Sequence, residues 1–423
     1  MSISEIYEIF QKCTGISTDT RTLQTNNLFI ALSGDNFNGN KFAEQALEKG
    51  ALYAIIDDRD YHSENTILVK NTLKTLQDLA NYHRKKLNTT IIALTGSNGK
   101  TTTKELINAV ISKKYNTTAT VGNLNNHIGV PLTLLLMTTD TEVGIVEMGA
   151  NNFREIELLS NIAQPDFGYI TNFGKAHLEG FGDINGVIKA KSELYTYLRQ
   201  NQKMAFVNND NSEQVKQSEH IKSFTFSEEQ HSNTKIEFIE ANPFVHVNYK
   251  NKTIKSNLIG QYNFTNIAAA IAMGEYFNVD TERICEAIEN YHSSNNRSQI
   301  IHKGTNKIIL DAYNANPTSM KAALENFNQL EASNKVIFIG DMFELGDTSK
   351  EEHQNIVDYI ESMTLRSCNI LGKHFKDTSH SNKIKSYVDF KALEIDSIDQ
   401  LEDCSILIKG SRGMALERIL DLL

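Results

Sequence analysis

Short apolar runs alternate along the chain with longer segments of helical periodicity. In the middle of the chain we predict strands at 91–95, 143–148, 167–171 and 204–207. Uniformly apolar runs of this length are typical of strands buried on both faces of a sheet. Segments with apolar residues at helical spacing separate them, which is the pattern of a mostly parallel α/β sheet.

The same pattern divides the chain into three predicted domains, 1–88, 89–300 and 301–423. In the first domain we expect strands at 28–32 and 53–56 and helices at 42–50 and 72–87. The central domain adds alternating segments that predict antiparallel strands and an alanine-rich helix, at 236–239, 244–249 and 266–277. The last domain begins a second αβ series, with predicted strands at 307–310, 336–339, 369–371 and 405–408.

Composition narrows the class of protein. A chain of 423 residues is long enough for two to four domains. Its formal net charge of −10 disfavours non-specific binding of nucleic acid, which requires a basic surface. The four cysteines are scattered and form no C-x-x-C pair, so we expect reduced thiols in a cytoplasmic protein. No apolar run approaches the length of a membrane span.

A glycine-rich turn follows the first central strand. Its residues are Gly96, Ser97, Asn98, Gly99, Lys100, Thr101 and Thr102, and a helix is predicted from Thr102. Such a turn presents backbone N–H groups and a helix N-terminus to phosphate, while lysine and threonine suit the β/γ-phosphates and Mg²⁺. G-x-x-G-K-T alone is also compatible with an ordinary loop, because Leu94 stands where the longer motif has glycine. The flanking strand and helix favour a nucleotide site.

Polar residues that follow other central strands are candidate metal ligands. Glu147 ends one predicted strand and His177 lies just beyond another, so both are expected at the same sheet edge as Gly96. A surface glutamate and a structural histidine are the plainer interpretations. Lys191 would be one more helix-surface lysine unless CO₂ converts it to a carbamate, whose two anionic oxygens suit a hard cation.

Further candidates surround the second domain boundary. Asn263 and Asn266 open the alanine-rich helix, where capping accounts for one of them. Arg297 suits a γ-phosphate, although exposed arginines are common. Asp311 begins a polar stretch that fits either a turn or hydrogen bonds to a ribose or peptide. Residues 409–413, Lys-Gly-Ser-Arg-Gly, are typical of a small anion-binding turn.

Together these motifs resemble the Mur ligase family, ATP-dependent amide-forming enzymes of peptidoglycan synthesis. The matching motifs stand at 95–102, 147–150, 172–177, 190–193, 262–266 and 409–412. Three further stretches, 122–132, 311–319 and 340–346, are similar to the dipeptide-adding branch of that family. An enzyme that adds the third residue would be expected to carry Tyr-Ala-His-Thr-Pro where this chain has Tyr-Asn-Ala-Asn-Pro.

The resemblance implies a UDP-binding N-terminal domain, a central P-loop domain and a Rossmann-like C-terminal domain. The implied reaction joins D-alanyl-D-alanine to UDP-N-acetylmuramoyl-tripeptide through an acyl phosphate, and yields the pentapeptide needed for cell-wall synthesis, cell shape and division. ATP, two Mg²⁺ ions and a monomer are expected. The alternatives are a third-residue-adding Mur ligase or a folylpolyglutamate synthase. A regulatory GTPase would need an Asn/Thr-Lys-x-Asp motif, which the sequence lacks.

The resemblance also implies roles for single residues. Lys100, His177, Lys191 and Arg297 are the expected catalytic residues. Thr101 and Glu147 would bind one Mg²⁺, His177 and carbamylated Lys191 the other. The remaining contacts implied are Asn266 with adenine, Asp311 with ribose, Arg297 with the γ-phosphate, Thr20 and Arg21 with the UDP end, Asn125 and Asn126 with the muramoyl peptide, and Asn314 and Asn316 with the dipeptide. Asn38 and Asn40 depart from the family's usual Asp and His, which leaves the uridine contacts open.

Overall fold

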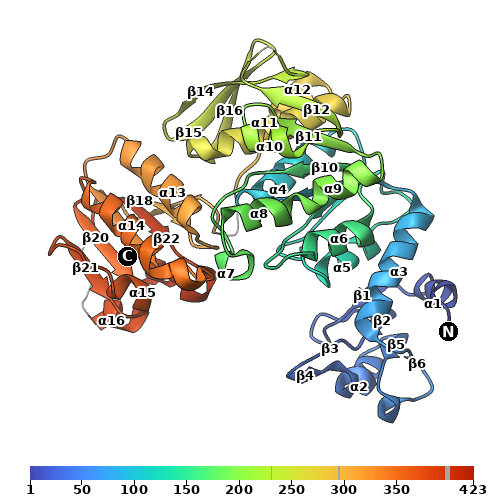
Figure 1. Ribbon diagram of the computed structural model, residues 1–423. Helices are drawn as coiled ribbons and strands as arrows, with labels where there is room; N and C mark the ends of the chain where they lie inside the picture. The colour runs from blue at the N-terminus through green and yellow to red at the C-terminus, as the bar shows by residue number, and fades with distance from the viewer. Residues whose placement is uncertain (230, 294–295, 396–400) are drawn as a thin grey trace.

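Figure 1 shows the computed structural model, which describes residues 1–229, 231–293, 296–395 and 401–423. The chain forms three parts, each built around its own sheet, as the blue, green-to-yellow and orange-to-red segments show. The α/β class and the parallel sheets predicted from the sequence are confirmed. Within the described residues, no helix combines the length and the apolar character needed to cross a bilayer.

The N-terminal part contains a four-stranded parallel sheet in the order β1-β2-β5-β6, at Gly15–Ser17, Asn27–Ile30, Tyr53–Ile56 and Thr66–Leu68. Its other elements are α1 (Ile3–Phe10), the β3–β4 hairpin (Ser33–Gly34, Phe37–Asn38), η1 (Gly39–Phe42), α2 (Ala43–Glu48), η2 (Arg59–Tyr61) and α3 (Thr72–Leu87). The predicted limits of α3 are confirmed. Arg84 on this helix donates to the carbonyls of Ala163 and Gln164 and to Asp166, so the helix is attached to the central part.

The central part is built on a seven-stranded parallel sheet in the order β13-β12-β11-β10-β7-β9-β8. The strands are β7 (Thr90–Thr95), β8 (Thr117–Ala119), β9 (Val143–Glu147), β10 (Phe167–Ile170), β11 (Met204–Asn208), β12 (Lys222–Ser227) and β13 (Thr234–Lys235). The four predicted strands match β7, β9, β10 and β11 to within one residue. The helices are α4 (Lys100–Ile111), α5 (Gly129–Leu135), α6 (Glu155–Ala163), α7 (Leu178–Phe181), α8 (Ile184–Lys191), α9 (Glu193–Gln200) and α10 (Ser212–Gln217).

A three-stranded antiparallel sheet extends this part, as the alternating pattern predicts. It consists of β14 (Glu237–Ala241), β15 (Phe244–Tyr249) and β16 (Lys252–Ile259). After η3 (Gln261–Asn263), the alanine-rich α11 (Phe264–Tyr276) is almost wholly buried, and α12 (Thr281–Glu289) follows. Because alanine side chains are short, α11 can pack closely between the strands and α4.

The C-terminal part contains a six-stranded sheet in the order β17-β18-β22-β19-β20-β21, in which only the β17–β18 pair is antiparallel among the described residues. The strands are Gln299–Lys303, Asn306–Asp311, Ser405–Lys409, Lys335–Gly340, Ser367–Leu371 and Ile384–Tyr387 in that order. The helices are α13 (Pro317–Gln329), η4 (Gly346–Thr348), α14 (Ser349–Glu361), α15 (Lys373–Lys376), α16 (Phe390–Ile395), η5 (Arg412–Met414) and η6 (Leu416–Asp421). Strand β17 begins at Gln299, two residues before the predicted start of the last domain at residue 301. The two predicted domain boundaries, at 88/89 and 300/301, stay predictions.

A buried histidine in this last part predicts sensitivity to acid. The His353 Nε2 atom accepts the Met342 backbone N–H at 3.0 Å, and Nδ1 donates to the Ser349 carbonyl at 2.7 Å, so the ring is neutral. Burial lowers the pKa of His353 below the usual 6.5, although the nearby Asp341 carboxylate opposes the shift. The unfolded chain therefore binds an extra proton below about pH 6.5, and the free energy of unfolding falls there while staying level above it.

We expect the melting temperature to fall between about pH 7 and pH 5.5, and to fall less steeply in His353→Gln, whose amide oxygen can still accept the Met342 N–H. Thermal unfolding at several pH values measures both slopes. His83 is also buried with its pKa lowered, so some slope remains in the variant. Equal slopes in the two proteins would contradict the assignment.

Candidate active site

A cavity of about 700 Å³ lies between the central and C-terminal parts. That volume is typical of sites for small-molecule ligands. Its lining brings together most of the residues singled out from the sequence, namely Ser97, Asn98, Gly99, Lys100, Thr101, Thr102, Asn125, Asn126, Glu147, His177, Asn266, Arg297, Asp311, Asn314 and Asn316. Gly96, Lys191, Thr20 and Arg21 lie outside the lining.

The loop after β7 has a conformation that requires glycine. Gly96 has φ +146°, and a Cβ atom there would lie 2.0 Å from the Thr171 hydroxyl oxygen. Gly99 has φ +78°, and its Cβ would lie 2.6 Å from Asn266 Oδ1. Helix α4 begins directly after Gly99, two residues earlier than predicted. The loop N–H groups and the positive end of a twelve-residue helix therefore face the same cavity.

Residues after β10 hold this loop in place, and the sequence analysis missed their role. Thr171 donates its hydroxyl to the Asn98 carbonyl at 2.6 Å. Asn172 donates to the same carbonyl at 2.9 Å and accepts the Asn98 N–H at 3.0 Å. The Ser97 hydroxyl pairs with the backbone of Gly174. Asn172 directly follows the predicted strand at 167–171, and β10 neighbours β7 in the sheet, so this position at a strand end is the signal that could have indicated these contacts.

Lys100 and Glu147 form the charged centre of the cavity. The Lys100 ammonium donates to the carbonyls of Gly96 and Ser97 at 2.8 and 3.3 Å. Burial lowers its pKa, with Glu147 opposing and Arg297 adding to the shift. Glu147 is 1% exposed; its Oε1 accepts from Asn125 at 2.7 Å, while Oε2 is buried without a hydrogen-bond partner in the described structure. A lone buried carboxylate oxygen in a cavity that Thr101 also lines suits a hard cation.

Lys191 is fully buried at the end of α8, so its interpretation as a surface lysine is wrong. Its Nζ atom donates to the Ala150 carbonyl at 3.1 Å and lies 5.2 Å from the centroid of the Phe181 ring. Burial, together with the nearby charge of Lys100, lowers the pKa of Lys191 to about 7. A large fraction of this amine is therefore uncharged near neutral pH.

His177 lies where the central part meets the C-terminal part. It precedes α7, and its Nδ1 atom lies 2.5 Å from Glu344 Oε2. That hydrogen bond lowers the pKa of Glu344. In the same loop, the Lys175 ammonium pairs with Glu352 at 2.6 Å. Sequence reasoning found His177 but missed both acids, since neither lies near the loop in the chain.

The two asparagines before α11 do not act as caps. Asn263 occupies the N-cap position, yet its side chain donates to the Ile259 carbonyl at 2.8 Å. Asn266 accepts from the Thr103 hydroxyl at 3.0 Å and donates to Asn263 Oδ1 at 2.8 Å. The capping interpretation is therefore wrong. Asn266 instead packs against Gly99 and lines the cavity beside the turn.

Arg297, in the connection between the two parts, and Asp311, at the end of β18, both line the cavity. The Arg297 guanidinium lies 3.6 Å from the centroid of the Tyr313 ring, and its Nε is buried without a partner in the described structure. Asp311 accepts the Ser298 N–H at 3.2 Å and pairs with Lys409 at 2.6 Å. Lys409 is 2% exposed, so the prediction of an anion-binding turn fails for this residue: its charge is matched by Asp311.

Asparagines line the remaining walls, and each has a structural partner. Asn316 caps α13 through the Ser319 N–H at 2.9 Å and donates to Asn98 Oδ1 at 2.7 Å, which joins α13 to the glycine loop. Asn126 accepts the Gly129 N–H at 2.9 Å at the start of α5. Asn314 is exposed, lines the cavity and accepts the Ala315 N–H at 2.9 Å.

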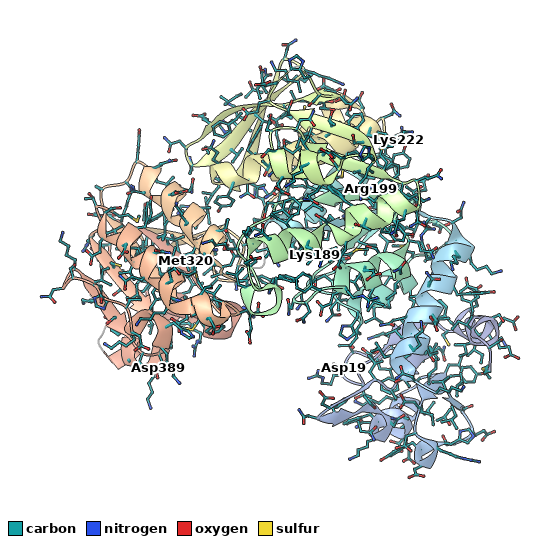
Figure 2. All side chains as sticks on the ribbon, in the orientation of Figure 1. Asp19, Lys189, Arg199, Lys222, Met320 and Asp389 are labelled. Atoms are coloured by element: carbon teal, nitrogen blue, oxygen red, sulfur yellow. The ribbon has the colours of Figure 1, made fainter. Side chains whose placement is uncertain are left out.

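Thr20 and Arg21 lie on the N-terminal part, away from this cavity. Figure 2 labels the neighbouring Asp19 there, Lys189 on the central part and Met320 on the C-terminal part. Arg21 pairs with Asp19 at 2.6 Å and lowers the pKa of that carboxyl to about 2. Asn40 is buried and donates to Asp57 at 2.8 Å, so this departure from the family pattern has a structural use.

Comparison with known proteins identifies the same family that the site motifs resemble. Three family models match the chain: "Mur ligase family, catalytic domain" at residues 12–84, "Mur ligase middle domain" at 94–274, and "Mur ligase, glutamate ligase domain" at 296–412. The chain is 35% identical to the UDP-N-acetylmuramoyl-tripeptide–D-alanyl-D-alanine ligase of Bacillus subtilis, over 96% of this chain and 92% of that protein. The Escherichia coli protein of the same name is 31% identical over the same shares.

Solved structures give the same result for the fold. MurF from Acinetobacter baumannii superposes with a TM-score of 0.86 at 28% identity, and covers 100% of this chain and 98% of its own. MurF from Thermotoga maritima, solved in complex with ADP, gives 0.85 at 24% identity over 98% and 97%. A folylpolyglutamate synthase from Mycobacterium tuberculosis reaches 0.62 at 13% identity over 82% and 94%, so its likeness is one of fold alone.

Proposed function

The chain belongs to the Mur ligase family, and we propose that within it this protein joins D-alanyl-D-alanine to UDP-N-acetylmuramoyl-tripeptide with hydrolysis of ATP. The observation that carries the proposal is similarity over almost the whole chain to relatives that bear this activity in their name. Asn314 and Asn316, which are typical of the dipeptide-adding branch, line the same cavity as the glycine loop. A joining reaction requires this, because the dipeptide must reach the phosphate-activated carboxyl group.

ATP occupies the cavity floor in this proposal. The N–H groups of residues 96–102 and the Lys100 ammonium bind the β/γ-phosphates, and Arg297 contacts the γ-phosphate with its unpartnered Nε. Asn266 lies at the adenine end and Asp311 at the ribose. Asp311 already accepts from Lys409 and Ser298, which holds its carboxylate toward the cavity.

Two Mg²⁺ ions would be held by oxygen and nitrogen donors around the loop. Thr101 and Glu147 would hold one, and the lone Glu147 Oε2 supports this assignment. His177 and carbamylated Lys191 would hold the other. A fully buried amine with one carbonyl acceptor is suited to react with CO₂ and lose a proton, since the uncharged form is the nucleophile. When bound, the ions neutralise phosphate charge as the carboxylate approaches.

Residues of the chain then assist two successive steps, transfer of the γ-phosphoryl group and transfer of the acyl group. The terminal carboxylate of the tripeptide attacks the γ-phosphorus and displaces ADP, while Lys100 and Arg297 reduce the repulsion between the anions. The amine of D-alanyl-D-alanine attacks the resulting acyl phosphate, loses a proton, and displaces phosphate from the tetrahedral intermediate. Residues of the C-terminal part line the cavity, and closure of this part over the central one would shield the acyl phosphate from water.

The extended substrate spans all three parts in this proposal. Thr20 and Arg21 bind the UDP end on the N-terminal part. Asn125 and Asn126, on the cavity wall, contact the muramoyl peptide, and Asn314 and Asn316 contact the dipeptide from the opposite side. The monomeric state and the cytoplasmic location stay predictions.

An assay of phosphate release separates this function from its alternatives. We expect release from ATP and Mg²⁺ only when UDP-N-acetylmuramoyl-tripeptide and D-alanyl-D-alanine are both present, with the pentapeptide as the product seen by mass spectrometry. Phosphate release with a single amino acid and UDP-N-acetylmuramoyl-dipeptide would indicate a third-residue-adding ligase. Release with folate and glutamate would indicate a folylpolyglutamate synthase, and either result would overturn the proposal.

A further inference from the structure

One side-chain contact connects the C-terminal part directly to a predicted metal ligand. Glu344, in the loop between β19 and η4, places Oε2 2.5 Å from the Nδ1 atom of His177. The backbone supports the pair, because the Glu179 N–H donates to the Glu344 carbonyl at 3.1 Å. Figure 1 shows α7, which begins directly after His177, on the side of the central part that faces the C-terminal part. The contact therefore depends on how the two parts are docked.

Both residues of the pair have an unusual backbone. His177 has φ +53° and Glu344 has φ +62°, in the left-handed region that L-residues with long side chains seldom adopt. The Glu344 side chain is also 47% exposed, so a single ion pair there contributes little to stability. Unfavourable backbone conformations that bring two side chains together without a gain in stability point to a functional need.

The chemistry of imidazole indicates that this need is to hold one tautomer of the His177 ring. A ring that donates its Nδ1 proton to a carboxylate keeps the lone pair on Nε2, and carboxylate–histidine–metal arrangements use this to orient the ligand. In the described structure the His177 ring makes no other hydrogen bond, and it lines the ATP cavity. Phe181 packs edge-on at 6.4 Å between ring centroids and restricts the ring from one side.

We propose that Glu344 is a positioning residue that fixes the tautomer and orientation of His177, and that it does so only while the C-terminal part is docked on the central part. Docking of one domain thus completes the cation site of the other before the dipeptide reacts. The inference rests on the proposed function, because it assigns the free Nε2 of His177 to a Mg²⁺ ion.

Two full-length variants test this. Glu344→Asn removes the carboxylate from reach of the ring, and asparagine tolerates the positive φ, so no new backbone strain is added. Glu352→Gln is the matched control, because it weakens a second ion pair between the same two parts, Lys175–Glu352, and leaves the His177 ring and Glu344 unchanged. The imidazole ¹⁵N shifts of His177, assigned with His177→Gln, report its tautomer at about pH 8. Phosphate release at varied Mg²⁺ reports the cation requirement.

In the wild type and in Glu352→Gln we expect His177 to be held with its proton on Nδ1. In Glu344→Asn we expect a mixture of tautomers and a Mg²⁺ requirement raised about 10- to 100-fold, as for other residues that orient a metal ligand. An unchanged tautomer in Glu344→Asn, or an equal rise in Glu352→Gln, would overturn the inference. If the wild type released no phosphate, the proposed function would fail, while the tautomers would still decide the role of Glu344.

Discussion

Replacing Lys100 with alanine is expected to lower the rate of phosphate release by at least about 100- to 1,000-fold, the usual cost of removing one preorganised electrostatic contact to a reacting group. The Lys100 ammonium is the cation nearest the loop carbonyls, within 2.8 Å of Gly96 O, and no water-exposed lysine is placed to substitute for it in the described cavity lining. Without it, the carboxylate and the triphosphate would meet with most of their repulsion uncompensated.

The fold of this variant should survive. The variant loses the lysine's bonds to the Gly96 and Ser97 carbonyls. The loop keeps its two glycines and the bonds from Thr171 and Asn172 to Asn98, which do not involve the lysine side chain. Lys113→Ala, just beyond α4 and paired with Glu286 at 3.1 Å, is the matched control and should keep wild-type turnover. Phosphate release and thermal unfolding of the three proteins test this. Turnover near the wild-type rate in Lys100→Ala would remove the phosphate role.

The local sequence pattern was sufficient to predict the strands, the helix and the glycine loop that position the site. The four central strands were predicted to within one residue because runs buried on both faces must be apolar throughout, whatever their neighbours are. The limits of α3 were predicted correctly as well. The glycine loop was equally readable, since positive φ and close approach at Gly96 and Gly99 exclude other residues. These features depend on a few consecutive positions.

Contacts between distant elements could not be read in the same way. Lys409 and Asp311 are 98 residues apart, and Asn98 and Asn316 are 218 apart, so their pairing depends on how two sheets are docked. The pairing of Lys409 with Asp311, which the predicted anion-binding turn at 409–413 did not include, is an example. The surface interpretation of Lys191 failed for a related reason: the residues that bury it, such as Phe181 and Ala150, come from other segments.

Lys191→Ala is the second variant with a large expected effect, because it should remove one ligand of a proposed cation. We expect phosphate release to fall by about 100-fold or more, which corresponds to roughly 3 kcal/mol of transition-state stabilisation. Lys189→Ala is the matched control on the same helix; Lys189 is exposed and labelled in Figure 2, and its loss should leave turnover unchanged. Both proteins should fold, since alanine is compatible with α8.

The variant also offers a test that a purely structural lysine would not pass. Lys191 is fully buried, so truncation to alanine leaves a space lined by Phe181 and the Ala150 carbonyl in which formate or acetate can supply the missing carboxylate oxygens. We therefore expect these acids to restore activity partly in Lys191→Ala and not in Lys100→Ala. With ¹³C-bicarbonate, the wild type should give a carbamate ¹³C signal that Lys191→Ala lacks. Full activity of Lys191→Ala, or a wild type without that signal, would dismiss the carbamate, because a lysine ammonium by itself offers Mg²⁺ no lone pair.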